Sequence, residues 1–332
     1  MSAETSHPLE TVPAGESEMI DRVVALQLEI VNKFQDPKKR GQHPKQQALL
    51  RGTLEVSDRL PEALRAGIFA RPGRFAALVR LSTGLLPKDS DGQAHGFAIK
   101  LLEVPDSPSG TQDFILIDQP SFFIRDVADY VEIFSAMVKG PSHDAAFYKS
   151  RPREFGLAQT FNVAISSHLE RQYWSELPIA MDGGAARLTV IPDVSNLSGR
   201  PPVTTPDGLR EALEDYFVTQ RRAAVFHFGA QAYVDPETTP IEDATAVWPT
   251  PFETVATLTL PAQDFRAPEQ YAVCESLSFT PWHCPAAHRP LGGIQRCRKR
   301  VYEESRRQRH ELTGAALHEP TRADYDALGA FL

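Results

Sequence analysis

Three residues near the C-terminus, Arg298, Tyr302 and Arg309, stand four and seven positions apart in the segment 292–310, which is predicted to be helical. On a helix, these spacings place side chains along nearly the same face. A guanidinium beside a phenol favours the ionised form of the phenol, because the opposite charge stabilises the phenolate. A phenolate is a hard anionic ligand that suits ferric iron. If the iron belongs to a flat ligand that also carries a carboxylate, Arg309, two turns further along, can bind that carboxylate through two hydrogen bonds.

The same helix has two other interpretations. Between positions 289 and 310 the chain has eight Lys or Arg residues and only two acids, Glu303 and Glu304. Such a helix is most often a solvated face or a nucleic-acid patch. The formal charge of the whole chain is −8, which argues against broad nucleic-acid binding, so we expect no such partner. Spacing alone leaves the choice between a solvated face and an iron ligand open.

Hydrophobic periodicity predicts the elements that must hold this helix in place. Residues 16–34 and 123–138 repeat apolar side chains at helical spacing, and helical character continues to about residue 180. A further helix is predicted over 205–222, where an N-cap signature precedes the pattern. Short aliphatic or aromatic segments bounded by Gly, Pro or Asp predict strands. These strands are 52–58, 75–83, 94–104, 113–118, 185–194, 223–235 and 253–262.

About seven or eight strands with intervening helices and a terminal helix predict one α+β domain with an antiparallel sheet or barrel core. We place this domain at 16–315, with a flexible lead over 1–15 and a C-terminal tail over 316–332. Hydrophobic residues make up 42% of the chain, enough for a substantial core. The 18 Phe residues suit the walls of an apolar pocket.

The cysteines and the N-terminus bear on the compartment. Three cysteines without a CxxC pair indicate neither a disulfide framework nor a thiolate zinc site. The polar, acidic N-terminus lacks the features of a signal peptide. No apolar run approaches the roughly 18 residues that cross a bilayer, so we expect a cytoplasmic protein without stable membrane insertion. The cluster Trp282-His283-Cys284 lacks metal-ligand spacing and is predicted to be a structural loop.

Six segments resemble the heme catalases and occur in the same order as in that family. Near the C-terminus, Arg298 and Tyr302 match the R-x-x-x-Y motif, and Arg309 matches the arginine seven residues after the tyrosine. The other segments are Arg40-Gly-Gln-His43-Pro-Lys45, Val79-Arg80-Leu81-Ser82-Thr83, His95-Gly96-Phe97-Ala98-Ile99-Lys100 and Asp118-Gln119-Pro120-Ser121-Phe122-Phe123-Ile124-Arg125-Asp126. The region 278–302 is more similar to the small catalase-related peroxidases. The resemblance implies a catalase-like antiparallel β-barrel with flanking helices and a C-terminal helix that carries the heme ligand.

The resemblance also implies a role for each matching residue. Tyr302 would be the proximal ligand of a heme b iron, with Arg298 supporting its ionised form. His43 would be the distal acid–base residue, with Ser82 hydrogen-bonding its ring. The remaining matches are the arginines that would bind the heme propionates, the residue at the position of the distal asparagine and an aromatic residue that would pack on the porphyrin. These are Arg40, Arg80 and Arg309, then Asp118, then Phe161.

Departures from the catalase pattern shape the expected activity. An ionised Asp118 can only accept hydrogen bonds, whereas asparagine can donate one to a peroxide. Its charge is also expected to raise the pKa of His43 and impair it as a base. Leu81 replaces an aromatic residue and His95 replaces an arginine. We therefore expect a heme peroxidase that uses hydrogen peroxide or organic hydroperoxides with a small-molecule reductant, and has only weak catalase activity.

Two other activities remain open at this point. A related heme enzyme could isomerise or cleave a fatty-acid hydroperoxide without an external reductant. A non-enzymatic heme binder or sensor is also compatible with the changed distal residues. By analogy with the catalases, we expect a homo-oligomer.

Overall fold

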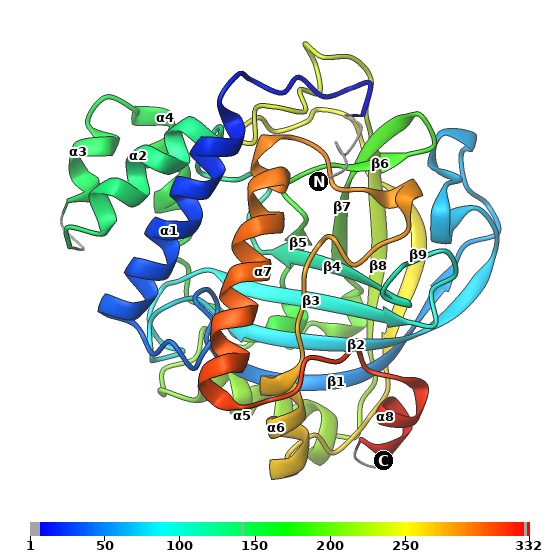
Figure 1. Ribbon diagram of the computed structural model, residues 1–332. Coiled ribbons are helices and arrows are strands. Elements are labelled where there is room, and N and C mark those ends of the chain that lie inside the picture. The colour runs from blue at the N-terminus through cyan, green and yellow to red at the C-terminus, as the bar shows by residue number, and fades with distance from the viewer. Residues whose placement is uncertain (1–6, 141–142, 329–330) are drawn as a thin grey trace.

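The computed structural model describes residues 7–140, 143–328 and 331–332 (Figure 1). Its strands are β1 (Lys45–Val56), β2 (Gly73–Thr83), β3 (His95–Leu102), β4 (Thr111–Ile117), β5 (Tyr173–Trp174), β6 (Ile179–Met181), β7 (Gly184–Pro192), β8 (Ala224–Ala232) and β9 (Glu253–Leu260). Its α-helices are α1 (Glu16–Phe34), α2 (Val127–Met137), α3 (Asp144–Tyr148), α4 (Pro152–Gln159), α5 (Gly208–Glu214), α6 (Pro268–Ser276), α7 (Gly293–Thr313) and α8 (Arg322–Ala327).

Eight of the strands close into an antiparallel barrel. They follow one another in the order β5-β4-β3-β2-β1-β9-β8-β7, and pairing of β5 with β7 closes the ring. Strand β6 lies outside the ring and pairs with β7 as a short hairpin, with one further bridge from Ile179 to Pro290. The predicted α+β fold with an antiparallel barrel core is therefore confirmed.

Side-chain alternation along the strands places apolar residues inside the barrel and polar residues on its outer surface. Val79 and Leu81 of β2 and Phe97 of β3 belong to the main hydrophobic core inside the barrel. Because side chains alternate along a strand, the intervening Arg80 and Ser82 project from the opposite face of the sheet. The outer surface of β1 to β3 thus carries polar groups toward the elements that cover it.

Helix α7 covers that outer surface. Figure 1 shows α7 lying across β2 and β3, with α1 beside it and α2 to α4 beyond α1. A second hydrophobic cluster joins α1, α2 and α7 through residues such as Val23, Val127 and Cys297. Below α7, helix α6 packs on β1 and β2 through Cys274 and Leu49. The predicted C-terminal helix is therefore held in place by apolar packing against α1 and α2.

Most predicted elements are present, with some errors. The helix predicted over 16–34 matches α1, and α7 and the long strands lie within a few residues of their predicted positions. The exception is β1, which begins earlier than predicted, at Lys45. Helical character predicted up to residue 180 is wrong beyond α4, because β5 and β6 lie there. Helices α6 and α8 were not predicted. Both are short, and a short amphipathic segment gives little periodic signal.

The described parts of the lead and the tail both contact the barrel domain. Glu10 forms ion pairs with Arg289 at 2.5 Å and with Arg296 at 2.6 Å, so the segment from His7 onward is anchored beside the start of α7. In the tail, Glu319 forms a 2.6 Å ion pair with Lys100, and Tyr325 is buried against β1 and β2. None of the helices in the described part of the chain is long and apolar enough to cross a membrane.

Arg296 connects the lead, α1 and α7, and its removal is expected to be costly. Its guanidinium contacts Glu10 at 2.6 Å, Glu16 at 2.7 Å and Glu242 at 3.1 Å, and Glu10 and Glu16 are almost wholly buried. Arg296→Gln leaves the buried Glu16 carboxylate without its counter-charge and removes one of the two counter-charges of Glu10, so we expect the free energy of unfolding to fall by about 3 to 5 kcal/mol. Urea unfolding measures this change.

The matched control for Arg296→Gln lies one turn along the same helix. Arg300 pairs with Asp21 at 2.8 Å, and both side chains are about half exposed. An exposed ion pair contributes roughly 0 to 1 kcal/mol, so Arg300→Gln should change stability little. Equal losses for the two variants would contradict the role given to Arg296.

Candidate active site

Three arginines from distant parts of the chain meet beside α6 and the lower end of α7. Arg40 and Arg309 both donate to the main-chain oxygen of Leu277, at 2.7 Å and 3.3 Å. Arg80, on β2, is close enough for its charge to act on Arg309. Arg80 and Arg309 are buried, and the Arg40 side chain is only 12% exposed. The fold therefore brings together the three arginines that the sequence assigned to one ligand.

The charge of this arginine cluster is poorly matched by the protein. Among the described residues, Glu275 is the one carboxylate within ion-pair distance of the three guanidiniums, at 3.5 Å from Arg40. Burial, with the charge of Arg40 added, lowers the pKa of Arg80 to about 10 and that of Arg309 to about 9. The buried Nε of Arg80 has no hydrogen-bond partner among the described residues. Like charges gathered in this way favour an anionic ligand.

His43 lies next to this cluster, just before β1 begins. Its main-chain oxygen accepts a 2.8 Å hydrogen bond from Arg80. Its backbone has a φ of 51°, a strained conformation for a residue other than glycine. The residue is partly exposed, but its ring Nδ1 is buried and makes no hydrogen bond with any described residue. Tertiary contacts therefore hold His43 in place against a local preference.

The surroundings of His43 keep its imidazole uncharged, so that it can act as a proton acceptor. Burial of the imidazole and the charge of Arg80 lower the pKa of His43 to about 4, although Asp118 acts in the opposite direction. The sequence-based expectation that Asp118 would keep His43 protonated is therefore wrong. At neutral pH His43 is uncharged and can accept a proton.

Ser82 and His43 approach the same point on β3 but do not bond. A Cβ placed on Gly96 would lie 2.8 Å from the Ser82 oxygen and 2.9 Å from His43 Nδ1. Only glycine leaves room for the imidazole at this position. The expected hydrogen bond from Ser82 to the ring is not formed, because His43 Nδ1 has no partner among the described residues. The structure brings the two side chains together without the predicted link.

Asp118 binds His95. Its carboxylate accepts hydrogen bonds from the main-chain N–H of His95 at 2.8 Å and from the ring Nδ1 at 2.7 Å. Arg171 adds a charged contact at 3.7 Å. Both His95 and Asp118 are almost completely buried. The two substitutions that departed from the catalase pattern are therefore partners of each other, and Asp118 makes no hydrogen bond to His43 Nδ1.

The proposed iron ligand is paired as its spacing predicted. Arg298 donates a 2.9 Å hydrogen bond to the phenol oxygen of Tyr302, one turn along α7. Burial lowers the pKa of Arg298, but the charges of Tyr302 and Glu176 outweigh it, so this pKa lies above its ordinary value. Arg298 is also close enough for its charge to act on His43. Arg298 thus lies within electrostatic reach of both proposed catalytic groups.

The ring of Tyr302 lines a cavity of about 450 Å³. Its walls come from α7, from the segment that precedes α7 and from the β3–β4 hairpin; His43 and the arginine cluster do not line it. Phe161 packs edge-on against Phe123 of the FFIRD segment, with ring centres 5.5 Å apart. No group of three or more His, Cys, Asp or Glu residues able to hold a metal ion occurs in the described ranges.

Sequence reasoning missed three features of this site. Glu275, the carboxylate nearest the arginine cluster, lies on the unpredicted helix α6. Arg171, beside Asp118, lies in a stretch wrongly expected to be helical. The pairing of His95 with Asp118 follows from the register of β3 and β4, in which Gly96 faces Ile117. The presence of both departures in adjacent predicted strands was a signal that could have suggested this pair.

The His95–Asp118 pair is expected to be strongly coupled. We expect His95→Gln and Asp118→Asn each to destabilise the fold, and the double variant to lose about 1 to 3 kcal/mol less than the sum of the two, because the second change removes a group already unpaired. Urea unfolding of the four proteins measures the coupling. The exposed pair of His227 and Asp193, 3.1 Å apart, supplies the control cycle, for which we expect less than about 1 kcal/mol. Equal coupling in both cycles would rule out the structural role of His95.

Comparison with known proteins agrees with this architecture. No family model and no curated protein matches the sequence. A solved structure of a bacterial catalase is similar over 98% of this chain, with 15% identity and a TM-score of 0.63. A crystal structure of a fungal catalase is similar over 92% of the chain, with 19% identity and a TM-score of 0.61. The chain spans 65% of the length of each catalase. A closed eight-stranded barrel covered by the tyrosine-bearing helix, together with these likenesses, shows that the chain has the catalase fold.

Proposed function

We propose that this chain binds heme b through Tyr302 and uses it to reduce hydrogen peroxide or organic hydroperoxides, with a small-molecule reductant and weak catalase activity. The observation that carries the proposal is the arginine cluster of Arg40, Arg80 and Arg309, which gathers beside His43 with one nearby carboxylate. A buried cluster of this kind is unfavourable unless an anion joins it. Kinship with the small catalase-related peroxidases remains part of the proposal.

The residues present fit a heme. Its two propionates would supply the negative charges that the arginine cluster lacks, including a partner for the unpaired Nε of Arg80. Tyr302 would bind the iron, and the hydrogen bond from Arg298 stabilises negative charge on the phenol oxygen. The aromatic pair of Phe161 and Phe123 supplies flat apolar surface near the same helices. When bound, heme supplies an iron centre that accepts electrons from the donor and passes them to the peroxide.

The protein contributes proton transfer. His43 is neutral at pH 7, so it can accept the proton of a peroxide's inner oxygen and return it to the departing outer oxygen. Because His43 Nδ1 has no hydrogen-bond partner among the described residues, no bond at that atom favours one tautomer of the imidazole over the other. Arg80 fixes the main chain of His43 and so helps position the imidazole.

The arrangement of Asp118 supports peroxidase rather than catalase chemistry. Asp118 has no amide group, so no donor stands at the position of the catalase asparagine. Both of its carboxylate oxygens accept hydrogen bonds from His95. Binding of a second hydrogen peroxide in the orientation needed for its oxidation would then lack a hydrogen bond, which costs about 1 kcal/mol or more in the transition state. An external reductant avoids this requirement.

Reconstitution with hemin tests the proposal. We expect the full chain to bind hemin one to one and give a ferric heme spectrum. Stopped-flow mixing with hydrogen peroxide and with cumene hydroperoxide should give fast peroxide cleavage, with oxygen release far below that of a catalase. A chain that stays colourless after hemin is added, or one that binds hemin without reacting with either peroxide, would refute it.

A further inference from the structure

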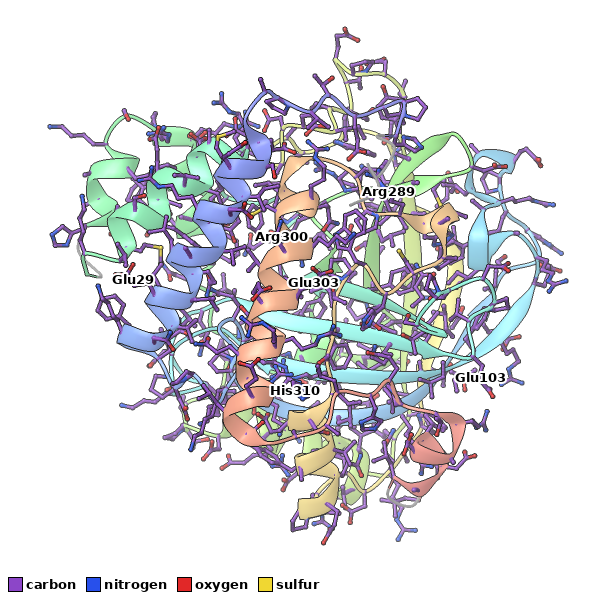
Figure 2. The ribbon with its side chains drawn as sticks, in the orientation of Figure 1. Glu29, Glu103, Arg289, Arg300, Glu303 and His310 are labelled. Atoms are coloured by element: carbon purple, nitrogen blue, oxygen red, sulfur yellow. The ribbon has the colours of Figure 1, made fainter. Side chains whose placement is uncertain are left out.

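A cavity of the described part of the chain lies against Tyr302, and the roles given above assign it no occupant. It holds about 450 Å³, several times the volume of a single aromatic ring with small substituents. Figure 2 labels two residues of its lining, Arg289 from the segment before α7 and Glu303 from the middle of that helix. The opposite wall includes Asp106 and Pro108 of the β3–β4 hairpin.

Aromatic rings make up much of this cavity wall. Phe279, Trp282 and Tyr302 all line it. The indole N–H of Trp282 donates to the main-chain oxygen of Gln295 at 2.8 Å, so the ring is fixed in position. Stacked and edge-on contacts between aromatic groups stabilise a bound ring by about 0.5 to 1.5 kcal/mol beyond its burial. The wall therefore suits a flat aromatic ligand.

His283 brings a hydrogen-bonding group to the same cavity. Its Nδ1 lies 3.1 Å from the Asp113 carboxylate and 3.2 Å from Lys100 Nζ, and Lys100 also bonds to Asp113 at 2.9 Å and to Glu319 at 2.6 Å. Lys100 is fully buried. This network fixes the imidazole through Nδ1, and Nε2 makes no hydrogen bond with any described residue. Nδ1 faces both a carboxylate acceptor, Asp113, and an ammonium donor, Lys100, so Nε2 accepts a hydrogen bond in one tautomer and donates one in the other. A hydroxyl group on a ligand in the cavity can bond to Nε2 in either case.

The charges around the cavity favour neither an anionic nor a cationic ligand. The cations Arg289, Lys299 and Arg306 line it, as do the anions Asp106 and Glu303, and Arg289 is already paired with Glu10. A ligand that combines an aromatic ring with one hydroxyl donor uses the rings and His283 without needing a counter-charge. Those are the properties of a small phenol.

We propose that this cavity, the Trp282–His283 cavity, binds the reductant as a neutral phenol, with its ring against Trp282 and Phe279 and its hydroxyl group hydrogen-bonded to His283 Nε2. The proposal rests on the function proposed above. Each phenol loses one electron and its hydroxyl proton and becomes a phenoxyl radical. Two phenols reduce one peroxide, whose O–O bond breaks as it takes up two electrons and two protons, giving water and an alcohol, or two waters from hydrogen peroxide. Tyr302, which lines the cavity, connects it to the proposed iron site.

The cavity is separate from the groups assigned to the heme apart from Tyr302. Arg40, His43, Arg80 and Arg309 are not among its lining residues. The heme and a phenol can then be bound at the same time, as the reaction requires. This separation is a testable part of the proposal.

Equilibrium dialysis of 2-methoxyphenol against the full chain, before and after hemin loading, tests the site directly. Methoxybenzene, which lacks the hydroxyl group, is the matched ligand. We expect the phenol to bind about 5- to 10-fold more tightly than methoxybenzene, the effect of one hydrogen bond. Binding that is equal for the two ligands would overturn the role of His283.

Two variants and one control locate the binding. His283→Phe should remove the difference between the two ligands. Ala286→Trp, at an exposed lining position, should fill the cavity and weaken both ligands at least 10-fold without touching the Lys100 network. The control is His227→Phe, an exposed histidine of β8 bonded to Asp193, which should bind as the wild type does.

The outcomes separate this proposal from the function on which it rests. Unchanged phenol binding by Ala286→Trp, in a protein that still binds hemin and cleaves peroxide, overturns the cavity assignment alone. Displacement of the phenol by hemin also overturns it, because the cavity would then belong to the heme. If phenol binds as expected but the chain takes up no hemin, the peroxidase function fails, and with it the role of the phenol as reductant.

Discussion

His43→Gln is expected to slow peroxide cleavage by the hemin-loaded chain about 100- to 10,000-fold, the usual contribution of general acid–base catalysis. Glutamine keeps the size and polarity of the side chain but cannot carry a proton between the two peroxide oxygens. Because Arg80 bonds to the main-chain oxygen of His43, the backbone geometry should survive the substitution. Stopped-flow absorbance with cumene hydroperoxide measures the rate, and hemin titration checks that the heme still binds.

The pH profile gives an independent check on the same residue. The pKa of His43 is lowered to about 4, so the wild-type rate should stay level from pH 8 to about 5 and fall only as the imidazole becomes protonated. The slow His43→Gln variant should lack this fall. A wild-type midpoint near 6.5, the ordinary value for histidine, would contradict the structure. His227→Gln, an exposed histidine bonded to Asp193, serves as the control for both measurements.

The same shift has a consequence for stability. A histidine whose pKa is lower in the folded state makes the fold lose stability as pH falls, because the unfolded chain takes up the proton first. For His43 the loss begins near pH 6.5 and is complete below about 4, and in total it amounts to about 3 kcal/mol. Urea unfolding across this range should show wild type losing this stability as the pH falls, whereas His43→Gln, whose glutamine takes up no proton, should not.

Spacing within single elements was a good guide to the site. The positions of Arg298, Tyr302 and Arg309 on one helix were enough to predict that Arg298 would reach the phenol oxygen. Motifs that matched in order also placed Arg40 and Arg80 with Arg309, although about 40 to 270 residues separate them. This worked because strand alternation fixes which side of the barrel wall each side chain must face.

Contacts between elements were harder to predict. Each departure from the catalase pattern was read by itself, so the effect of Asp118 on the pKa of His43 was taken as dominant, whereas burial and Arg80 outweigh it. Strand register instead pairs it with His95. The direction of the His43 pKa shift depends on whether burial or charge is larger, and a sequence does not give the depth of burial. The loop at Trp282-His283 gave no metal-site signal because its partners, Lys100, Asp113 and Glu319, come from distant parts of the chain.

Tyr302→Phe is expected to weaken hemin binding at least about 100-fold and to change the spectrum of any heme that remains. Altering a group that only supports a metal ligand typically costs 10- to 100-fold in affinity, and loss of the ligand itself should cost at least as much. Phenylalanine keeps the ring packing but removes the oxygen to which Arg298 donates. The buried guanidinium then also loses a partner, which adds to the effect.

Tyr130→Phe is the sharpest control for this variant. Tyr130 lies on α2, close enough for its charge to act on Arg298, and burial raises its pKa well above the ordinary value for tyrosine. A phenol held in its neutral form is a poor ligand for ferric iron, so Tyr130→Phe should leave hemin affinity and the absorption spectrum unchanged. If Tyr130→Phe loses heme and Tyr302→Phe keeps it, the iron ligand is Tyr130 on α2, and the proposal that α7 carries the ligand is wrong. If both variants keep the wild-type spectrum, the iron ligand is neither tyrosine, and the arginine cluster must serve a different anion.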